Sequence, residues 1–232
     1  MLKKSLSIIM CLAMLFVFGT SSALAENKST ETMLNMDSIE IEVDYESAQI
    51  NDDGTTTYDV SNAKDVALSY GIDDAKSVKV TIFNENQNEL NFMPQAASYN
   101  SIYIDNVIKS GEGCGTEEIT RNTAINRKNK KIDKEITLIG TVSNEYSLNV
   151  EAGTNVEVAS ISSAVGFNVS KTWSMSDNTI VSLEPNESVT VYAYPLYNFY
   201  QFDVMKNPLW GSAKNVGSGS AYKCKGFCTV IQ

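Results

Sequence analysis

Apolar and polar residues alternate with a period of two along most of the chain, a pattern typical of strands that bury one face. In residues 39–46 every second position is acidic. Asp53-Gly54 predicts a hairpin turn within 50–58, because both residues tolerate positive φ. Further strands are predicted at 78–82, 101–104, 136–142, 146–150, 156–161, 165–175, 188–194, 197–204 and 221–230.

One segment has the helical period instead. Between residues 61 and 70 the side chains of Ala63, Val66, Ala67 and Tyr70 share one helical face, and Gly71 is placed to end the helix. About ten strands with short connections and one short helix predict a mainly β fold, either an antiparallel β-sandwich or an open barrel.

The stretch 165–175, VGFNVSKTWSM, has the most regular alternation and allows two interpretations. It could be a core strand or one arm of a hairpin that enters lipid. Lys171 falls in the middle of its apolar face, where lipid contact would cost about 2–4 kcal/mol. A turn at 176–178 would leave only 179–184 as the returning arm before Pro185. We therefore expect a core strand.

The N-terminal residues are typical of a secretory signal peptide. Lys3 and Lys4 precede an apolar run at 8–18, and Ala23-Leu24-Ala25 has the small-x-small pattern of a cleavage site. We expect cleavage after Ala25 and a secreted, extracellular protein. A second apolar run of about 18–20 residues is lacking, so we expect no stable membrane span.

Charge divides the remaining chain. Residues 26–118 carry 19 acidic and 5 basic side chains, whereas 119–232 carry 9 and 11. The acidic half argues against nucleic acid as a partner, because the two would repel each other. We predict an acidic β-rich region at 26–110, a polar basic linker or loop at 111–134 and a β-rich region at 135–232. The two β-rich regions could form one continuous sandwich.

The chain has no histidine, which excludes Ser-His and Cys-His nucleophile pairs and most zinc sites. Phosphate-binding loops, dinucleotide fingerprints and nucleophile elbows are also missing from the sequence. We therefore expect no enzyme, no cofactor and no metal. An extracellular hydrolase that uses two distant carboxylates stays open as an alternative.

Three cysteines follow the predicted cleavage site: Cys114, Cys224 and Cys228. An odd number in an oxidising compartment allows one disulfide and one remaining thiol. Cys224 and Cys228 could bridge only across a turn at 225–227, because an extended strand would hold them about 13 Å apart. We favour a long-range bridge from Cys114 to one of them.

Aromatic residues are densest near the C-terminus, and both faces of the predicted strand there carry rings. Such rings can pack in a core, or they can be exposed and bind a sugar, a membrane interface or a protein. We take them as the candidate binding surface, for a cell-surface component or another protein. Its residues are Tyr192, Tyr194, Tyr197, Phe199, Tyr200, Phe202 and Trp210.

The segments ISSAVGFNVSKTWSM, NESVTVYAYPLYNFYQFDV and GSGSAYKCKGF resemble a group of secreted Gram-positive proteins to which no activity is attached. That resemblance implies origin and export only. The Ser/Thr/Val alternation also resembles aerolysin-type pore-forming toxins. We expect a secreted, non-enzymatic binding or interaction protein that acts at or outside the bacterial surface. The first alternative is a pore-forming, toxin-like or antimicrobial protein.

Overall fold

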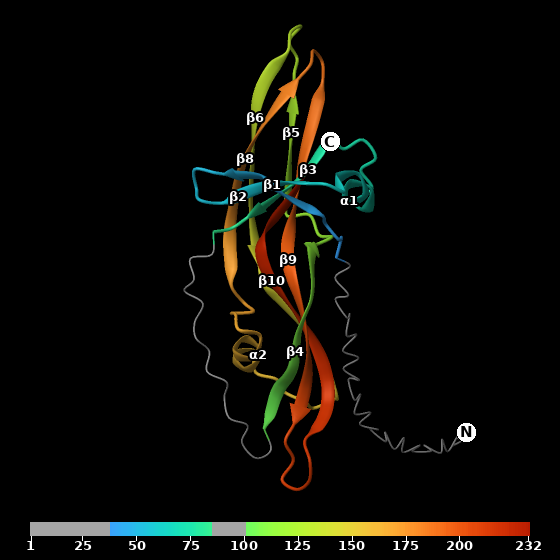
Figure 1. Ribbon diagram of the computed structural model, residues 1–232, viewed down its shortest axis with the longest axis vertical. Coiled ribbons are helices and arrows are strands. Elements are labelled where there is room, and N and C mark those ends of the chain that lie inside the picture. Colours follow the sequence, from blue (N-terminus) through green and yellow to red (C-terminus); the bar gives the residue numbers. More distant parts are fainter. Residues whose placement is uncertain (1–37, 85–100) are drawn as a thin grey trace, which may run out of the picture. The chain divides into compact units, whose positions relative to one another are not determined.

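Two long antiparallel strands, β9 (Ser188–Lys206) and β10 (Lys214–Ile231), form the centre of the fold (Figure 1). The computed structural model describes residues 38–84 and 101–232. These belong to one compact unit, Thr32–Gln232. The predicted signal peptide lies outside the described residues.

Each central strand changes its outer neighbour along its length. β10 pairs with β3 near its C-terminal end and with β7 near its N-terminal end, while β9 pairs with β5 and then β4. The path β1-β2-β3-β10-β9-β4 completes the eight-stranded antiparallel sheet. The bounds are β1 (Val43–Ile50), β2 (Thr56–Val60), β3 (Ser77–Ile82), β4 (Ile102–Cys114), β5 (Thr120–Ile125) and β7 (Glu145–Val150).

Pro195 interrupts neither β9 nor the sheet. It lies where β9 changes partner, between Leu196, which pairs with Cys114, and Ala193, which pairs with Thr120. The N–H that proline lacks is therefore not needed for a ladder at this point, and the Pro195 carbonyl still accepts a hydrogen bond from Gly115 N–H at 2.7 Å.

A second, two-stranded sheet consists of β6 (Ile132–Ser143) and β8 (Thr172–Leu183). It forms a second layer, because its apolar side chains share a core with those of β5, β9 and β10. That core contains Ile136, Leu138, Met175, Val181 and Leu183 from the small sheet, and Ala124, Val189, Val191, Ala193, Phe227 and Ile231 from the large one. The fold is mainly β and antiparallel, as predicted.

The hairpin turn and the first helix are confirmed. β1 and β2 flank Gly54, whose φ is +84°, and α1 (Ala63–Ser69) buries Val66 and Ala67. Gly71, at φ +73°, follows the helix. The segment 111–134, which we predicted as linker or loop, holds the end of β4, all of β5 and the start of β6. The alternation of apolar and polar residues in β5 is weak, because Ala124 is the one buried residue of that strand.

Three predictions between residues 156 and 184 are wrong. Residues 156–161 do not form a strand, because α2 (Val158–Val165) occupies much of this stretch. Of the predicted strand 165–175 only residues 172–175 are extended, because β8 begins at Thr172. The expected turn at 176–178 lies inside β8, which runs without a break to Leu183. The supposed returning arm 179–184 therefore belongs mostly to the same strand.

The long-range bridge that we favoured is confirmed as Cys114–Cys228, with the two Cα atoms 6.1 Å apart. It joins the end of β4 to β10 within a buried cluster that includes Val80, Leu196 and Tyr194. Cys224 is buried and its thiol lies 3.4 Å from the carbonyl oxygen of Gly226. In the described part of the chain, no helix combines the length and the apolar composition needed to cross a membrane.

Candidate functional site: the β6–β8 ribbon and its connecting segment

β6 and β8 form a ribbon whose two strands pair along their entire length. Each strand has twelve residues. The first pair is Ile132 with Leu183, and the last is Ser143 with Thr172. Among the described residues neither strand joins the ladder of the large sheet. Side-chain packing and a hydrogen bond from Asn122 Nδ2 to the Thr137 carbonyl hold the ribbon in place.

The two faces of the ribbon differ sharply. The inner face is apolar and packs on the core, whereas the outer face is exposed and rich in hydroxyl groups. Two isoleucines, Ile139 and Ile180, are exposed on that outer face. The outer residues are Asp133, Glu135, Thr137, Ile139, Thr141, Ser143, Thr172, Ser174, Ser176, Asn178, Ile180 and Ser182.

The inner face contains one half-buried carboxyl group, that of Asp177. Asp177 lies opposite Leu138 and accepts a hydrogen bond from the Thr179 hydroxyl at 3.0 Å. Burial raises the pKa of the Asp177 carboxyl above its ordinary value, although the Thr179 hydrogen bond opposes this. The charged form is therefore disfavoured where this side chain lies.

A buried asparagine holds each end of the ribbon. At the Ile132 end, Asn126 is fully buried and its side-chain amide donates to the carbonyls of Lys130, Leu183 and Glu184 at 2.8–3.0 Å. These bonds tie the loop before β6 to the end of β8. Asn126 therefore links the chain that enters β6 to the end of β8, at the ribbon end where the two strands are not directly connected.

Asn144 holds the opposite end. Its Nδ2 donates to the Asn168 carbonyl at 2.6 Å, and its Oδ1 accepts from the Cys224 backbone N–H at 2.7 Å. Its own N–H donates to the Lys171 carbonyl at 2.8 Å, one step beyond the last pair of the ribbon. Asn144 thus connects both strands of the ribbon to β10.

The neighbouring residue adds a second tie to the large sheet. The Tyr197 hydroxyl donates to a Glu145 carboxylate oxygen at 3.1 Å. Burial raises the pKa of Glu145 above its ordinary value, while the bond from Tyr197 opposes that rise and Glu117 adds to it. Burial also raises the pKa of the Tyr197 hydroxyl, which therefore remains a donor at neutral pH.

Residues 144–171 connect the two strands at this end. β7 pairs with β10 from Glu145 to Val150, and α2 packs against β4 with Ile161 and Val165 buried. The helix is short, it has no side-chain hydrogen bond at its N-cap Glu157, and Gly166 ends it at φ +81°. Its sequence VASISSAV is rich in serine and β-branched residues, which disfavour helix.

The predicted aromatic binding residues lie in three different clusters. Tyr192 and Tyr194 pack beside the disulfide, Tyr197 and Phe199 beside Tyr222, and Tyr200 and Phe202 near α2. Tyr194, Tyr197, Phe199 and Phe202 are buried, and Tyr192 and Tyr200 are half-buried. Packing therefore accounts for these rings, and their role in binding stays a prediction. Trp210 alone of the set is fully accessible, at 91% exposure.

Nothing in the sequence pattern singles out Asn126 or Asn144. Each is one asparagine among many, and its hydrogen-bond partners are up to 80 residues away in the chain. Within 144–171 the alternation correctly predicts the strand at 146–150, but it also predicts strand at 156–161 and 165–171, where the chain forms a helix and a loop.

No family model matches the chain, and no curated protein matches it. A putative pore-forming toxin from Bacteroides vulgatus is similar over 81% of both chains, with 8% identity and a TM-score of 0.31. The parasporin-2 toxin of Bacillus thuringiensis is similar over 72% of this chain and 74% of its own, with 11% identity and a TM-score of 0.28.

A lamprey immune protein is similar over 58% of this chain, with 10% identity and a TM-score of 0.27. That match spans only 54% of the lamprey chain. Two of these three solved structures are those of proteins named as toxins. At such TM-scores and identities the similarities carry no argument about this chain.

Proposed function

We propose that this protein is a secreted, toxin-like protein that permeabilises membranes. In this proposal residues 144–171 leave the large sheet and extend the β6–β8 ribbon into one long hairpin. The observation that carries the proposal is the register of the ribbon, because extending it into the connecting segment would set apolar residues opposite apolar residues.

The continuation follows from the observed pairing. The ribbon ends with Ser143 opposite Thr172, and Asn144 N–H already bonds to Lys171. The same register sets three further apolar pairs on the face that is apolar in the ribbon: Tyr146 with Val169, Leu148 with Phe167, and Val150 with Val165. The polar face continues as Ser147 with Asn168 and Asn149 with Gly166.

The lengths fit a bilayer. Residues 146–154 and 161–169 would supply two arms of about nine residues each, and a spanning strand needs about 9–11. Residues 155–160 would form the tip. Lys171, which counted against insertion when 165–175 was read as a single strand, would lie outside the spanning part with Asn144. A long lysine side chain at this boundary can reach water.

The conversion has a local driving force. Residues 161–169 alternate as a strand does, yet 161–165 are in a helix whose composition disfavours it and whose N-cap lacks a side-chain bond. Such conflict between local preference and the folded state is typical of segments with a second accessible conformation. The apolar side chains of residues 161–169 are now covered by the large sheet. After the conversion they would be covered by lipid instead.

The proposal predicts that holding β7 on β10 blocks permeabilisation. Ser147 and Ser220 are direct partners in this ladder, and directly opposed residues are close enough for a disulfide. The variant with Ser147→Cys and Ser220→Cys should release dye from phosphatidylcholine vesicles at least about tenfold more slowly when oxidised. Dithiothreitol should restore release.

A second staple provides the control. Thr57 and Thr81 are partners in β2 and β3, with hydroxyl oxygens 2.9 Å apart, in strands that the proposal leaves unmoved. Their replacement by cysteines should leave dye release unchanged. Wild-type protein with dithiothreitol controls for reduction of Cys114–Cys228. An absence of dye release by wild-type protein at micromolar concentration, with or without limited proteolysis, contradicts the proposed function.

A further inference from the structure

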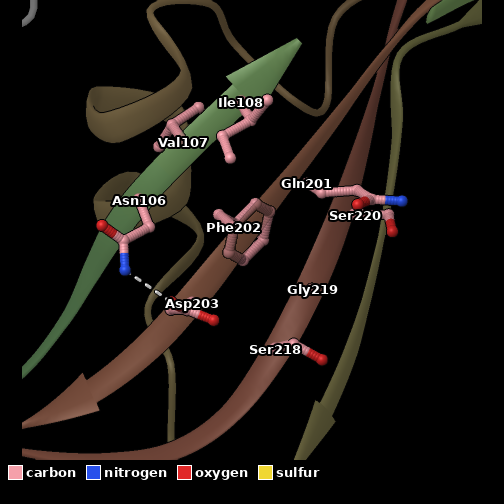
Figure 2. Close-up of a pocket in the computed structure, with 9 residues that line it drawn as sticks. All are labelled: Asn106, Val107, Ile108, Gln201, Phe202, Asp203, Ser218, Gly219 and Ser220. Atoms are coloured by element: carbon pink, nitrogen blue, oxygen red, sulfur yellow. Dashed lines mark hydrogen bonds between the residues drawn. The ribbon is translucent and has the colours of Figure 1, made fainter. Parts of the chain in front are cut away.

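A groove of about 740 Å³ crosses the outer face of the large sheet where β4, β9 and β10 run side by side (Figure 2). Its size is within the range of small-molecule sites, about 300–1,000 Å³. Its polar wall comes from Asn106, Gln201, Asp203, Ser218 and Ser220.

A β-bulge directs one side chain into this groove. The register of β4 on β9 shifts between Asp105 and Ile108, so Asn106 and Val107 have no direct partners on β9. Asn106 has φ +51°, a conformation uncommon for a residue with a side chain, and its N–H donates to the Asp105 carboxylate. The bulge thereby aims a side chain, as bulges near binding sites often do.

The Asn106 side chain contacts Asp203, the one carboxylate among the residues that line the groove. Asn106 Nδ2 donates to Asp203 Oδ2 at 2.6 Å, and Figure 2 shows the two side chains facing each other across the strands. This bond fixes both groups and leaves Asp203 Oδ1 and Asn106 Oδ1 as acceptors. Ser218 and Ser220, opposite Asp203 and Gln201 in the ladder, add hydroxyl groups that donate and accept.

The composition of the groove selects a class of ligand. Its lining residues include one carboxylate and neither lysine nor arginine, so a phosphate or sulfate would be repelled. Amide, carboxylate and hydroxyl groups together can pair with a ligand whose hydroxyls both donate and accept. Ile108, 63% exposed, adds an apolar contact at the edge.

We infer that this groove is a binding site for a neutral, polyhydroxylated ligand of the carbohydrate class, with Asn106 and Asp203 as its central polar pair. Gly219 allows the Phe202 ring to pack closely against β10, because a Cβ at position 219 would lie 2.4 Å from that ring. Phe202 remains packed below the groove and does not serve as a stacking platform. The inference is independent of the proposed membrane activity.

The test measures binding of neutral oligosaccharides to the full chain without membranes. The probes are maltotriose, lactose and the trimer of N-acetylglucosamine. Their binding is measured by saturation-transfer NMR and by calorimetric titration. At least one should bind, and Asp203→Asn and Asn106→Gly should each weaken it about tenfold or more. Asn106→Gly suits the positive φ and removes only the side chain. Glu46→Gln, at an exposed position of β1, is the matched control and should change nothing.

Three outcomes overturn the inference. The first is that none of the three probes binds at millimolar concentration. The second is that a probe binds and neither groove variant weakens it. The third is that inorganic phosphate binds more tightly than the sugars and competes with them. Circular dichroism of both variants should match the wild-type protein, which separates loss of the site from loss of folding.

Discussion

At the scale of single residues, buried asparagines decide how the ribbon is held. Asn126 and Asn144 each place a side-chain amide where several backbone groups need partners, and a buried backbone group left without one is costly. The sequence could not predict either role, because partners such as Cys224 come close to Asn144 only through tertiary folding.

Replacing Asn144 with alanine should destabilise the fold and speed membrane permeabilisation. The change leaves the Asn168 carbonyl and the Cys224 N–H without this partner, at a cost of about 1–3 kcal/mol. Urea denaturation measures the stability, and dye release from vesicles measures the rate.

Asn126→Ala is the matched comparison, since it removes a similar set of hydrogen bonds at the other end of the ribbon. It should lower stability to a similar extent without accelerating dye release. Equal acceleration in the two variants would show that general destabilisation, rather than release of residues 144–171, controls permeabilisation.

At the scale of elements, strand periodicity was a good guide wherever one face meets the core and the other meets water. It predicted β3, β7 and the centre of β6. It failed for α2, because tertiary packing of Ile161 and Val165 against β4 and its neighbours outweighs the local preference of the sequence. The segment that was wrongly predicted as strand also belongs to residues 144–171, which would leave the large sheet in the proposed function.

Strengthening α2 should therefore slow permeabilisation. Glu157 is the N-cap residue and makes no side-chain capping bond. Glu157→Ser supplies a favoured cap, and a good cap contributes about 1 kcal/mol to helix stability. Dye release should slow roughly fivefold if the rate follows the population of the released segment. Glu46→Ser, at an exposed position of β1, is the control. Unchanged release by Glu157→Ser would argue against unfolding of α2 as a required step.

At the scale of the whole molecule, alternation and turn signals were enough to predict a mainly β, antiparallel fold. They could not predict that β9 and β10 each serve two neighbours in succession, because that arrangement depends on contacts between distant segments. Ion pairs such as Lys76–Glu187 and Lys225–Glu112 join the acidic and the basic parts of the chain. Both parts contribute strands to one sheet.

The disulfide should account for a large part of the stability of this assembly. Its cysteines are 114 residues apart, and closing so long a loop restricts the unfolded chain. Replacing Cys114 and Cys228 together with serine should lower the free energy of unfolding by about 2–4 kcal/mol, as measured by urea denaturation. Cys224→Ala should cause a smaller loss. An equal loss in both variants would mean that packing of the thiols, rather than the bridge, is responsible.

The same bridge also determines what proteolysis can achieve. Cys114 and Cys228 enclose β5 to β8, α2, all of β9 and most of β10 in one covalent ring. A single cut in the exposed turn at 151–153 would open this ring without releasing a fragment, since both pieces stay attached through the cystine. The nicked protein would keep its mass on a non-reducing gel, while β7 and α2 would gain free ends. A protease could therefore loosen residues 144–171 and leave the rest of the molecule covalently intact.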